Sequence, residues 1–223
     1  MKLRLIVLFA VAQVSFAFAQ NTQTPEEKEK YEQVITQRAD KIVQTLALND
    51  ERKQTAARDI IKDQYSDLND IYADRDLEIA SAKTKYAEDK TAKEAELAKI
   101  NTDVEKSLSK LHKKYLSKLS SKLTEEQIEQ VKNGMTYSVL PLTYQAYQEE
   151  ILTLTAAQKS QIYTWLVEAR EHAMDAESSN KKHAWFGKYK GRINNYLSAQ
   201  GYDLKKEGIE WEKRIKAKKE NTL

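Results

Sequence analysis

Residues 56–72 read AARDIIKDQYSDLNDIY, and their pattern predicts the fold class of the chain. Its apolar residues recur every three or four positions, which is the spacing of one face of an α-helix. The face comprises Ala57, Ile60, Ile61, Tyr65, Leu68, Ile71 and Tyr72. No glycine or proline occurs between Pro25 and Gly134, and good helix formers dominate there. This half of the chain is therefore predicted to be helical throughout.

Another helix is predicted before this stretch. Residues 24–27 read TPEE, which is the pattern of a capping box with proline at the first helical position. Apolar residues at helical spacing continue from there to about Leu48. Asn49 or Asp50 is then predicted to cap the second, longer helix.

The apolar face of the second helix is interrupted beyond Ile79. Residues 87–94 read AEDKTAKE and offer only alanine to a core, whereas larger apolar residues return at helical spacing from Leu97 to Leu119. We interpret the gap as the exposed tip of a helical hairpin whose arms pack against each other. A single unbroken helix across residues 50–122 is the alternative, because no residue in the gap breaks a helix.

The second half of the chain has a different composition. It contains all five glycines and all three tryptophans, which predicts shorter helices joined by shaped loops. The pattern LTxxQ occurs at residues 123–127 and 154–158, where the threonine can cap a helix and the glutamine can complete a capping box. We predict an all-α fold in one domain over residues 20–223. A long helical hairpin region, residues 24–122, precedes a compact helical region, residues 123–223.

The first residues predict export. Two basic residues precede an apolar run at residues 5–12, and residues 17–19 read AFA, which is the layout of a cleavable signal peptide. Residues 1–19 are therefore predicted to be removed by cleavage between Ala19 and Gln20, which leaves a secreted or periplasmic chain. The apolar run is shorter than the roughly 20 residues that span a bilayer. No membrane attachment is expected after cleavage.

Composition excludes several classes of function. The chain has no cysteine, which excludes disulfides, thiol catalysis and lipid attachment through an N-terminal cysteine. Its formal net charge of +3 includes Lys2 and Arg4 of the predicted signal peptide. Loss of these two of the 37 basic residues leaves 35 against 34 acidic residues. A near-neutral chain has no general attraction for nucleic acid, so nucleic acid is not expected as a partner.

A candidate ligand-binding surface lies within residues 170–196, which read REHAMDAESSNKKHAWFGKYKGRINNY. Aromatic rings, positive charges that include Lys182, and amides are interleaved there, which suits an anionic or neutral oligosaccharide. The candidate ligand-binding residues are Trp185, Phe186, Lys188, Tyr189, Lys190, Arg192, Asn194 and Asn195. The competing interpretation is that the three aromatic residues pack in a core at helical spacing.

Catalysis is a second interpretation of the same segment. The candidate catalytic residues are Glu168, His172, Asp175 and His183. Carboxylates and histidines together can perform acid–base chemistry or hold a metal, but surface ion pairs also explain such residues. Their spacing matches no specific motif, so neither a metal nor a cofactor is predicted, and whether the chain is an enzyme stays open. His112, which lies among lysines, is predicted to be a solvated surface residue.

The two LTxxQ copies permit a third interpretation. The pattern is similar to that of periplasmic LTxxQ chaperones and adaptors, which carry two such motifs on a small helical fold. That similarity implies partner binding on a concave helical surface. It rests on residues 123–127 and 154–158 only, and helix capping explains both copies.

Longer strings carry a resemblance to another family. They are GMTYSVLPLTY at residues 134–144, WLVEAREHAMDA at 165–176 and KKHAWFGKYKGRINNYLSAQGYDL at 181–204, with upstream matches at 34–46 and 58–72. With these strings the chain resembles the secreted bacterial family catalogued as domain of unknown function 3826. Its members are often encoded beside polysaccharide-degrading enzymes, so the resemblance implies a glycan-binding or accessory role. A periplasmic hydrolase or lyase that acts on polysaccharide is the alternative, and the resemblance transfers no catalytic residue.

Overall fold

The computed structural model describes residues 24–220 of the chain. This part forms eight α-helices and no β-strand, which confirms the all-α prediction. The helices are α1 (Pro25–Gln44), α2 (Glu51–Lys85), α3 (Lys90–Ser120), α4 (Glu125–Met135), α5 (Val139–Glu150), α6 (Ala156–Met174), α7 (Ser179–Ala199) and α8 (Leu204–Glu220). Among these helices none is long and apolar enough to cross a membrane. The predicted signal peptide at residues 1–19 lies outside the described residues.

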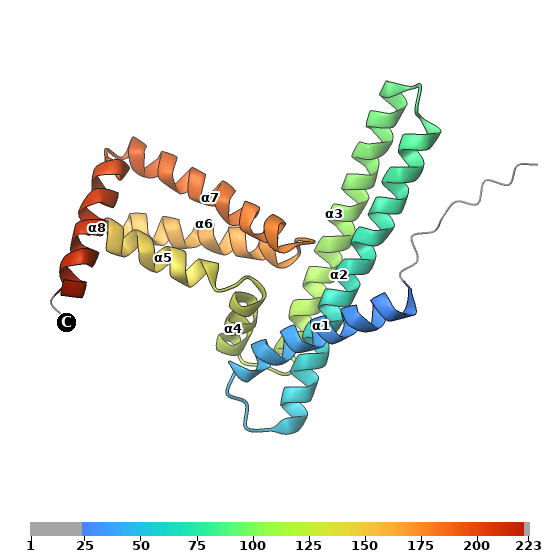
Figure 1. The fold of residues 1–223 in the computed structure, drawn as a ribbon, viewed down its shortest axis with the longest axis horizontal. Helices are drawn as coiled ribbons and strands as arrows, with labels where there is room; N and C mark the ends of the chain where they lie inside the picture. Colours follow the sequence, from blue (N-terminus) through green and yellow to red (C-terminus); the bar gives the residue numbers. More distant parts are fainter. Residues whose placement is uncertain (1–23, 221–223) are drawn as a thin grey trace, which may run out of the picture.

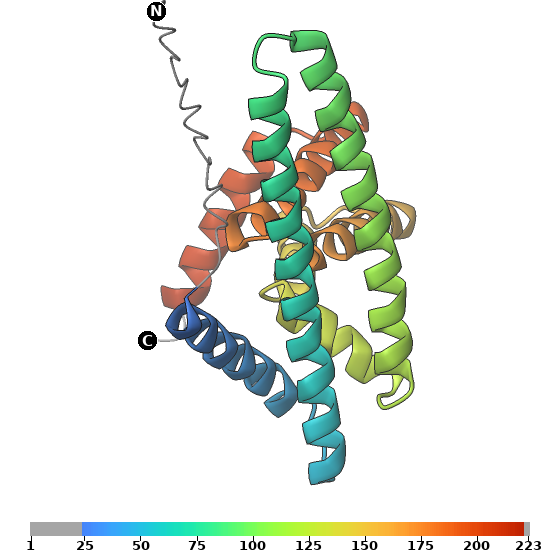
Figure 2. The ribbon, with the colours of Figure 1, turned by 90° about the vertical axis from the view of Figure 1, so that its right-hand side faces the viewer.

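Helices α2 and α3 form the predicted long hairpin and run antiparallel side by side (Figures 1 and 2). The tip lies at residues 86–89, at the N-terminal edge of the predicted gap. The chain leaves the helix at Tyr86, and Asp89 then caps α3 by accepting a hydrogen bond from the backbone N–H of Ala92. The alternative of one unbroken helix is wrong, because this turn reverses the chain.

Capping chemistry explains where several helices begin. The side chains of three threonines accept a hydrogen bond from the backbone N–H three residues on, and the side-chain oxygen of the glutamate or glutamine at that position accepts one from the threonine N–H. They are Thr24, Thr124 and Thr155. Asp50 caps α2. The predicted capping boxes are confirmed, and Leu123 and Leu154 of the two LTxxQ copies are buried, so this pattern has a structural role.

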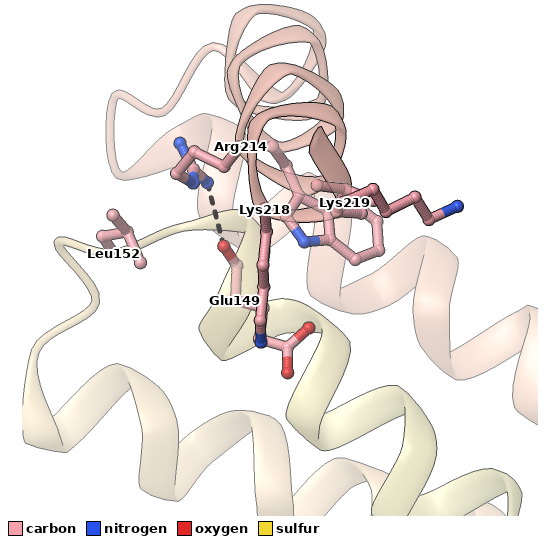
Figure 3. Close-up of a pocket in the computed structure, with 7 residues that line it drawn as sticks. Glu149, Leu152, Arg214, Lys218 and Lys219 are labelled. Carbon is pink, nitrogen blue, oxygen red and sulfur yellow. Dashed lines mark hydrogen bonds between the residues drawn. The ribbon is translucent and has the colours of Figure 1, made fainter. Parts of the chain in front are cut away.

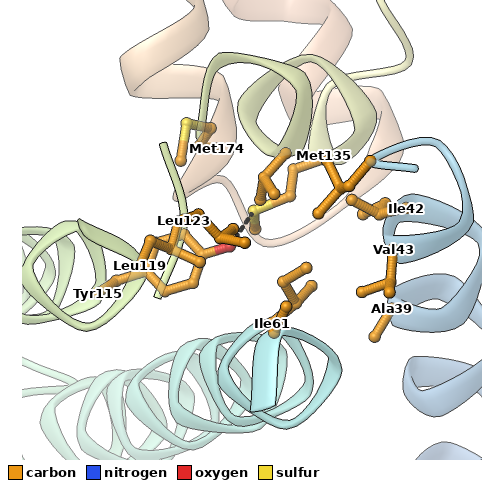
Figure 4. Close-up of a cluster of buried hydrophobic side chains, with 12 residues drawn as sticks. Ala39, Ile42, Val43, Ile61, Tyr115, Leu119, Leu123, Met135 and Met174 are labelled. Atoms are coloured by element: carbon orange, nitrogen blue, oxygen red, sulfur yellow. Dashed lines mark hydrogen bonds between the residues drawn. The ribbon is translucent and has the colours of Figure 1, made fainter. Parts of the chain in front are cut away.

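The first hydrophobic cluster lies where α1 and α4 pack against the α2–α3 hairpin (Figure 4). Its fully buried members include Ile61 of α2 and Leu119 of α3, and burying a side chain of this size contributes roughly 1.5–3 kcal/mol. The Tyr115 hydroxyl lies 3.1 Å from the Met135 sulfur, which gives the one polar atom of this buried ring a partner. Met174, at the end of α6, completes the cluster and so joins the C-terminal region to the hairpin.

A second cluster forms the core of the C-terminal region. Helices α6 and α7 lie antiparallel, α5 lies along α6, and α8 lies across their far end (Figure 1). The buried members are Leu140, Tyr147, Ile151, Leu154, Ile162, Leu166, Ala169, Ala173, Phe186, Tyr189, Ile193 and Leu197. These helices confirm the compact C-terminal region. The single-domain boundaries stay a prediction.

Gly134 lies in α4 where α1 approaches it closely. A Cβ atom at this position would lie 2.8 Å from Cγ1 and 3.2 Å from Cγ2 of Ile42. We expect Gly134→Ala to lower the free energy of unfolding by about 1–3 kcal/mol, because the close-packed Ile42 side chain must move. Urea unfolding followed by far-UV circular dichroism measures this change.

Gly191→Ala is the matched control for Gly134→Ala. Gly191 also lies inside a helix, but a Cβ atom there would meet no atom within 4 Å. Alanine is the better helix former, so this substitution is expected to raise the free energy of unfolding by about 0.5–1 kcal/mol. Equal effects of the two substitutions would contradict the close approach of α1 and α4.

Candidate functional site

The turn between α6 and α7 meets the side of the α2–α3 hairpin (Figure 1), and a cleft of about 650 Å³ opens there. We term it the junction cleft. It is lined by Tyr72, Arg75, Glu105, Leu108, Ser109, His112, Lys113, Glu171, His172, Asp175, Ala176, Glu177, Lys181 and Trp185. Ligand pockets typically enclose about 300–1,000 Å³, so this cleft is large enough for a small ligand.

Two side chains of α2 hold the α6–α7 turn against the hairpin. The Tyr72 hydroxyl donates a hydrogen bond of 2.7 Å to the backbone carbonyl of Asp175, and Arg75 forms an ion pair with Glu177. Asp175 ends α6, and Ser178 caps α7 with its side chain, so the turn is short. These contacts hold the two walls of the junction cleft together.

His112 of α3 bridges two carboxylates of α6 and its C-cap. Its Nδ1 lies 2.7 Å from Oδ2 of Asp175, and its Nε2 lies 3.3 Å from Oε2 of Glu171. Hydrogen bonds to Asp175 and then to Glu171 raise the pKa of His112 to about 9, although burial opposes this rise. The ring is therefore an imidazolium at neutral pH and donates from both nitrogens. In that state it has no free nitrogen to act as a general base.

A network of cations surrounds Glu171 on its other side. Its Oε1 lies 3.2 Å from Nζ of Lys132 and 3.3 Å from Nη2 of Arg170. Burial by itself would raise the pKa of Glu171, but the hydrogen bond from His112, the charge and hydrogen bond of Lys132 and the charge of Arg170 lower it to about 2. Arg170 is 1% exposed and also binds Glu129 at 2.7 Å. The network links α3, α4 and α6 and keeps Glu171 ionised.

Trp185 of α7 and His172 of α6 form an aromatic wall of the junction cleft. Their rings stack with centroids 4.3 Å apart and planes 13° apart. The Lys188 ammonium lies 5.0 Å from the Trp185 ring centroid. The pair supplies an apolar surface beside the polar side chains of the hairpin, which is the combination that an amphipathic ligand needs.

The structure brings two of the four candidate catalytic residues, His172 and Asp175, to the junction cleft. Glu168 lies outside it in an exposed ion pair with Arg192 at 3.6 Å. His183 lies on another side of α7, where its ring stacks on a tyrosine outside the cleft. Within residues 24–220, no group of three or more histidines and carboxylates is arranged to hold a metal ion.

The candidate ligand-binding residues are spread around α7 and do not share one face. Phe186 and Tyr189 are 1% and 9% exposed within the second hydrophobic cluster. The prediction that they present ring faces to a ligand is therefore wrong, and the core interpretation is correct for both. Trp185 is the one of these three rings that lines the junction cleft. Successive helix positions rotate by about 100°, so neighbouring rings on α7 cannot all reach the same surface.

The polar candidates on α7 also lie in different surroundings. Arg192 lies over a tryptophan ring of α6, outside the junction cleft. Lys190 and Asn194 line a separate pocket of about 330 Å³, where the Asn194 side chain accepts a hydrogen bond of 2.7 Å from the Tyr147 hydroxyl. Asn195 is exposed. The single ligand-binding surface that the sequence suggested is thus divided among several sides of the helix.

Two residues have roles that sequence reasoning missed. The prediction that His112 is a solvated surface residue is wrong, because its side chain is 18% exposed and contacts two carboxylates. The sequence could have indicated that His112 is partly buried. His112 follows Val104 and Leu108 at four-residue spacing, so it lies at the edge of the apolar face of α3. Lys182 is 6% exposed, and its ammonium donates to the carbonyl of Met174, so it is not part of a solvated basic face.

A larger groove of about 850 Å³ lies between the end of α5 and α8 (Figure 3). Its lining is Glu149, Leu152, Trp211, Arg214, Ile215, Lys218 and Lys219. The Arg214 guanidinium donates hydrogen bonds of 2.9 Å to the backbone carbonyls of Glu149 and Glu150, where α5 ends. A cation at a helix C-terminus is favourable. This contact fastens α8 to the rest of the chain, so we assign the groove a packing role.

Comparison with known proteins supplies a family but no described activity. No curated protein matches the chain. A family model described as "Protein of unknown function (DUF3826)" matches residues 32–217, which include all of α2–α7 and every residue of the junction cleft. A match over most of the chain confirms the resemblance stated from its strings. The chain therefore belongs to the DUF3826 family of proteins of unknown function.

Proposed function

We propose that this chain is an exported glycan-binding protein, in which a short uncharged part of an oligosaccharide lies in the junction cleft. The observation that carries the proposal is the stacked pair of Trp185 and His172 beside the polar side chains of the hairpin. A pyranose ring has an apolar C–H face and a rim of hydroxyl groups. It is therefore complementary to a wall that combines aromatic rings with hydrogen-bonding groups.

Lys188 does not prevent a ligand from reaching Trp185. Its side chain is exposed, and a cation–π contact at an exposed site contributes only about 0.5–1 kcal/mol. A sugar that covers the indole ring would displace the ammonium into water at little cost. The stacking contact between Trp185 and His172 would remain and keep the indole ring in place.

The charges of the junction cleft favour a neutral ligand. With His112 protonated, the lining carries four basic and four acidic side chains. The basic ones are Arg75, His112, Lys113 and Lys181, and the acidic ones are Glu105, Glu171, Asp175 and Glu177. Such a balanced set produces little net field, so it supplies hydrogen bonds to hydroxyl groups without selecting for charge.

Binding is better supported than catalysis. Acid–base catalysis is most efficient when the catalytic group has a pKa near the working pH. In this cleft, hydrogen bonds to Asp175 and then Glu171 raise the pKa of His112 to about 9, and His112, Lys132 and Arg170 together lower the pKa of Glu171 to about 2. Both groups are therefore held in one charged form across the neutral range, which suits a fixed polar wall.

The predicted signal peptide and the family resemblance support a glycan over other ligands. An exported chain meets extracellular polysaccharides and not cytoplasmic nucleic acid, and members of the resembled family are often encoded beside polysaccharide-degrading enzymes. The chaperone alternative rests on the LTxxQ pattern alone, and helix capping accounts for this pattern, because the two leucines are buried and both threonines cap helices. Glycan binding is therefore the proposal that these observations support together.

Trp185→Ala tests this proposal. An array of neutral and acidic plant-type oligosaccharides identifies a ligand for the unmodified chain, and calorimetric titration measures its affinity. We expect a neutral oligosaccharide to bind and Trp185→Ala to weaken it by roughly 30-fold, the loss typical of a tryptophan at the centre of a binding site. Far-UV circular dichroism should show unchanged helix content in the variant.

Trp211→Ala is the matched control, because this tryptophan lines the groove at α8 and not the junction cleft. The Trp211→Ala variant is expected to bind the same oligosaccharide with the affinity of the unmodified chain. Two results would count against the proposal. They are the absence of binding to every oligosaccharide on the array, and an affinity that Trp185→Ala leaves unchanged.

A further inference from the structure

A second cavity lies on the other side of the α6–α7 turn. It encloses about 630 Å³ and shares Tyr72, Ala176 and Glu177 with the junction cleft. Its walls come from α1, α2, the residues at the end of α4 and the start of α7. Four tyrosines line it, Tyr31, Tyr65, Tyr72 and Tyr137, so we term it the tyrosine cavity.

The tyrosine cavity carries an excess of positive charge. Its basic lining residues are Arg38 and Lys41 of α1 and Lys182 of α7, and none of the three forms an ion pair within residues 24–220. The one carboxylate in the lining, Glu177, is paired with Arg75. This composition contrasts with the balanced charges of the junction cleft. Unpaired cations around one cavity attract an anion.

Lys182 is the most unusual of these cations because it is buried, with 6% of its surface exposed. Its ammonium has three hydrogens to donate; the Met174 carbonyl accepts one of them at 3.0 Å, and the centroid of the Tyr65 ring lies 5.8 Å from the ammonium. Burial lowers the pKa of Lys182 to about 8. The charge of Asp175 opposes this fall, but within residues 24–220 no carboxylate forms an ion pair with Lys182, so an anion beside the ammonium would reduce the cost of burying it.

Other donors surround the same space. Ser178 and Ser179, at the N-terminus of α7, line the cavity, and the backbone N–H of Ser179 has no acceptor in the described part of the chain. The Tyr65 hydroxyl has no hydrogen-bond partner among residues 24–220, and burial raises its pKa to about 12, so it remains a donor. The positive end of the α7 dipole adds to the attraction for an anion.

Strained backbone lies at one edge of the tyrosine cavity, at Tyr137 and the residue that follows it. Tyr137 and Ser138 both have left-handed conformations, with φ of 58° and 55°, which residues with a side chain rarely adopt. Tyr137 is 49% exposed, and its ring stacks on that of His183 with the ring centroids 5.3 Å apart. Backbone strain of this kind clusters at sites that bind ligands.

We propose that the tyrosine cavity binds a small ring-bearing molecule with one carboxylate, such as a sugar acid. Arg38 and Lys182 hold the carboxylate, and the N-terminus of α7 adds donors. The tyrosine rings contact the ring of the ligand, so we expect an inorganic anion alone to bind less tightly. The site lies on the other side of the α6–α7 turn from the junction cleft, and it does not depend on the function proposed for that cleft.

Isothermal titration with glucuronate, glucose, benzoate and inorganic phosphate tests the site on the full mature chain. Glucuronate is expected to bind, whereas glucose, which lacks the carboxylate, is not. Lys182→Met and Arg38→Gln should each weaken glucuronate binding roughly 10- to 100-fold, because each removes a charged hydrogen-bond donor. Raising the pH from 7 to 10 should weaken binding to the unmodified chain and leave the low affinity of Lys182→Met unchanged.

Lys190→Met is the matched control, because Lys190 is an exposed lysine of the same helix that lines neither cavity. It should bind glucuronate as the unmodified chain does. Arg38 is exposed, so Arg38→Gln keeps the test valid even if Lys182→Met folds poorly. Absence of glucuronate binding, or unchanged binding in both variants, would overturn the site. If phosphate binds as tightly as glucuronate, the proposed role of the tyrosine rings is wrong. If benzoate binds more tightly than glucuronate, the ligand is an aromatic acid and the proposal of a sugar acid is wrong.

Discussion

Replacing Arg170 with alanine is expected to lower the free energy of unfolding by about 3–5 kcal/mol. The guanidinium is 1% exposed and bridges Glu129 of α4 to Glu171 of α6. Alanine would leave Glu171 half-buried with fewer cations around it, and would also open a cavity where the long side chain lies. Urea unfolding at neutral pH, followed by far-UV circular dichroism, measures the loss.

Arg192→Ala is the control for the Arg170 substitution. Arg192 also pairs with a glutamate, Glu168, but the side chains are 56% and 45% exposed and the atoms lie 3.6 Å apart. A pair of this kind contributes about 0–1 kcal/mol. Arg192→Ala should therefore lower the free energy of unfolding several times less than Arg170→Ala does. A cost below about 1 kcal/mol for Arg170→Ala would show that the network between α4 and α6 does not stabilise the fold.

His112→Gln is expected to lower the free energy of unfolding by about 2–3 kcal/mol at pH 6, and by less than about 1 kcal/mol at pH 10. The pKa of His112 is about 9 in the folded chain, above its ordinary value of 6.5. The folded chain therefore binds the proton more tightly than the unfolded chain does. The resulting stabilisation is complete below pH 6.5 and is lost as the pH rises through 9. Urea unfolding of both proteins across this range measures the difference.

Asp175→Asn provides a second measurement of the same interaction. The hydrogen bond to Asp175 is the largest cause of the raised pKa of His112, so the loss of stability between pH 6.5 and pH 9 should be smaller in this variant. The difference in the free energy of unfolding between the unmodified chain and the variant at each pH removes the contribution of lysines and tyrosines that titrate at high pH. An identical pH dependence in the unmodified chain and His112→Gln would contradict the charged bridge.

Much of the fold was predictable from local patterns. The capping boxes at Thr24, Thr124 and Thr155 form as predicted, because a cap involves residues only three positions apart. The hairpin tip was located to within a few residues, although its alanine-rich composition left a continuous helix possible. Packing of the two arms against each other decided between a hairpin and a continuous helix. Ile100 and Tyr115 of α3 are buried in the folded chain.

The candidate site was predicted only in part. His172, Asp175 and Trp185 were identified from their chemistry, and all three line the junction cleft. Phe186 and Tyr189 have the same kind of chemistry as Trp185, yet α7 turns them into the core. Which ring of a helical aromatic cluster is accessible depends on the helix that packs against it, and residue type does not determine this.

The helical class, the positions of the caps and the place where a hairpin tip could form follow from the sequence, because periodicity and capping act within a few residues along the chain. Which side chains share a site depends on how the helices pack together. Asp175 contacts His112, 63 positions earlier, and Tyr72, 103 positions earlier. Contacts over such separations form when two hairpins pack together, and no local pattern specifies their relative position. The junction cleft and the tyrosine cavity therefore exist only in the folded chain.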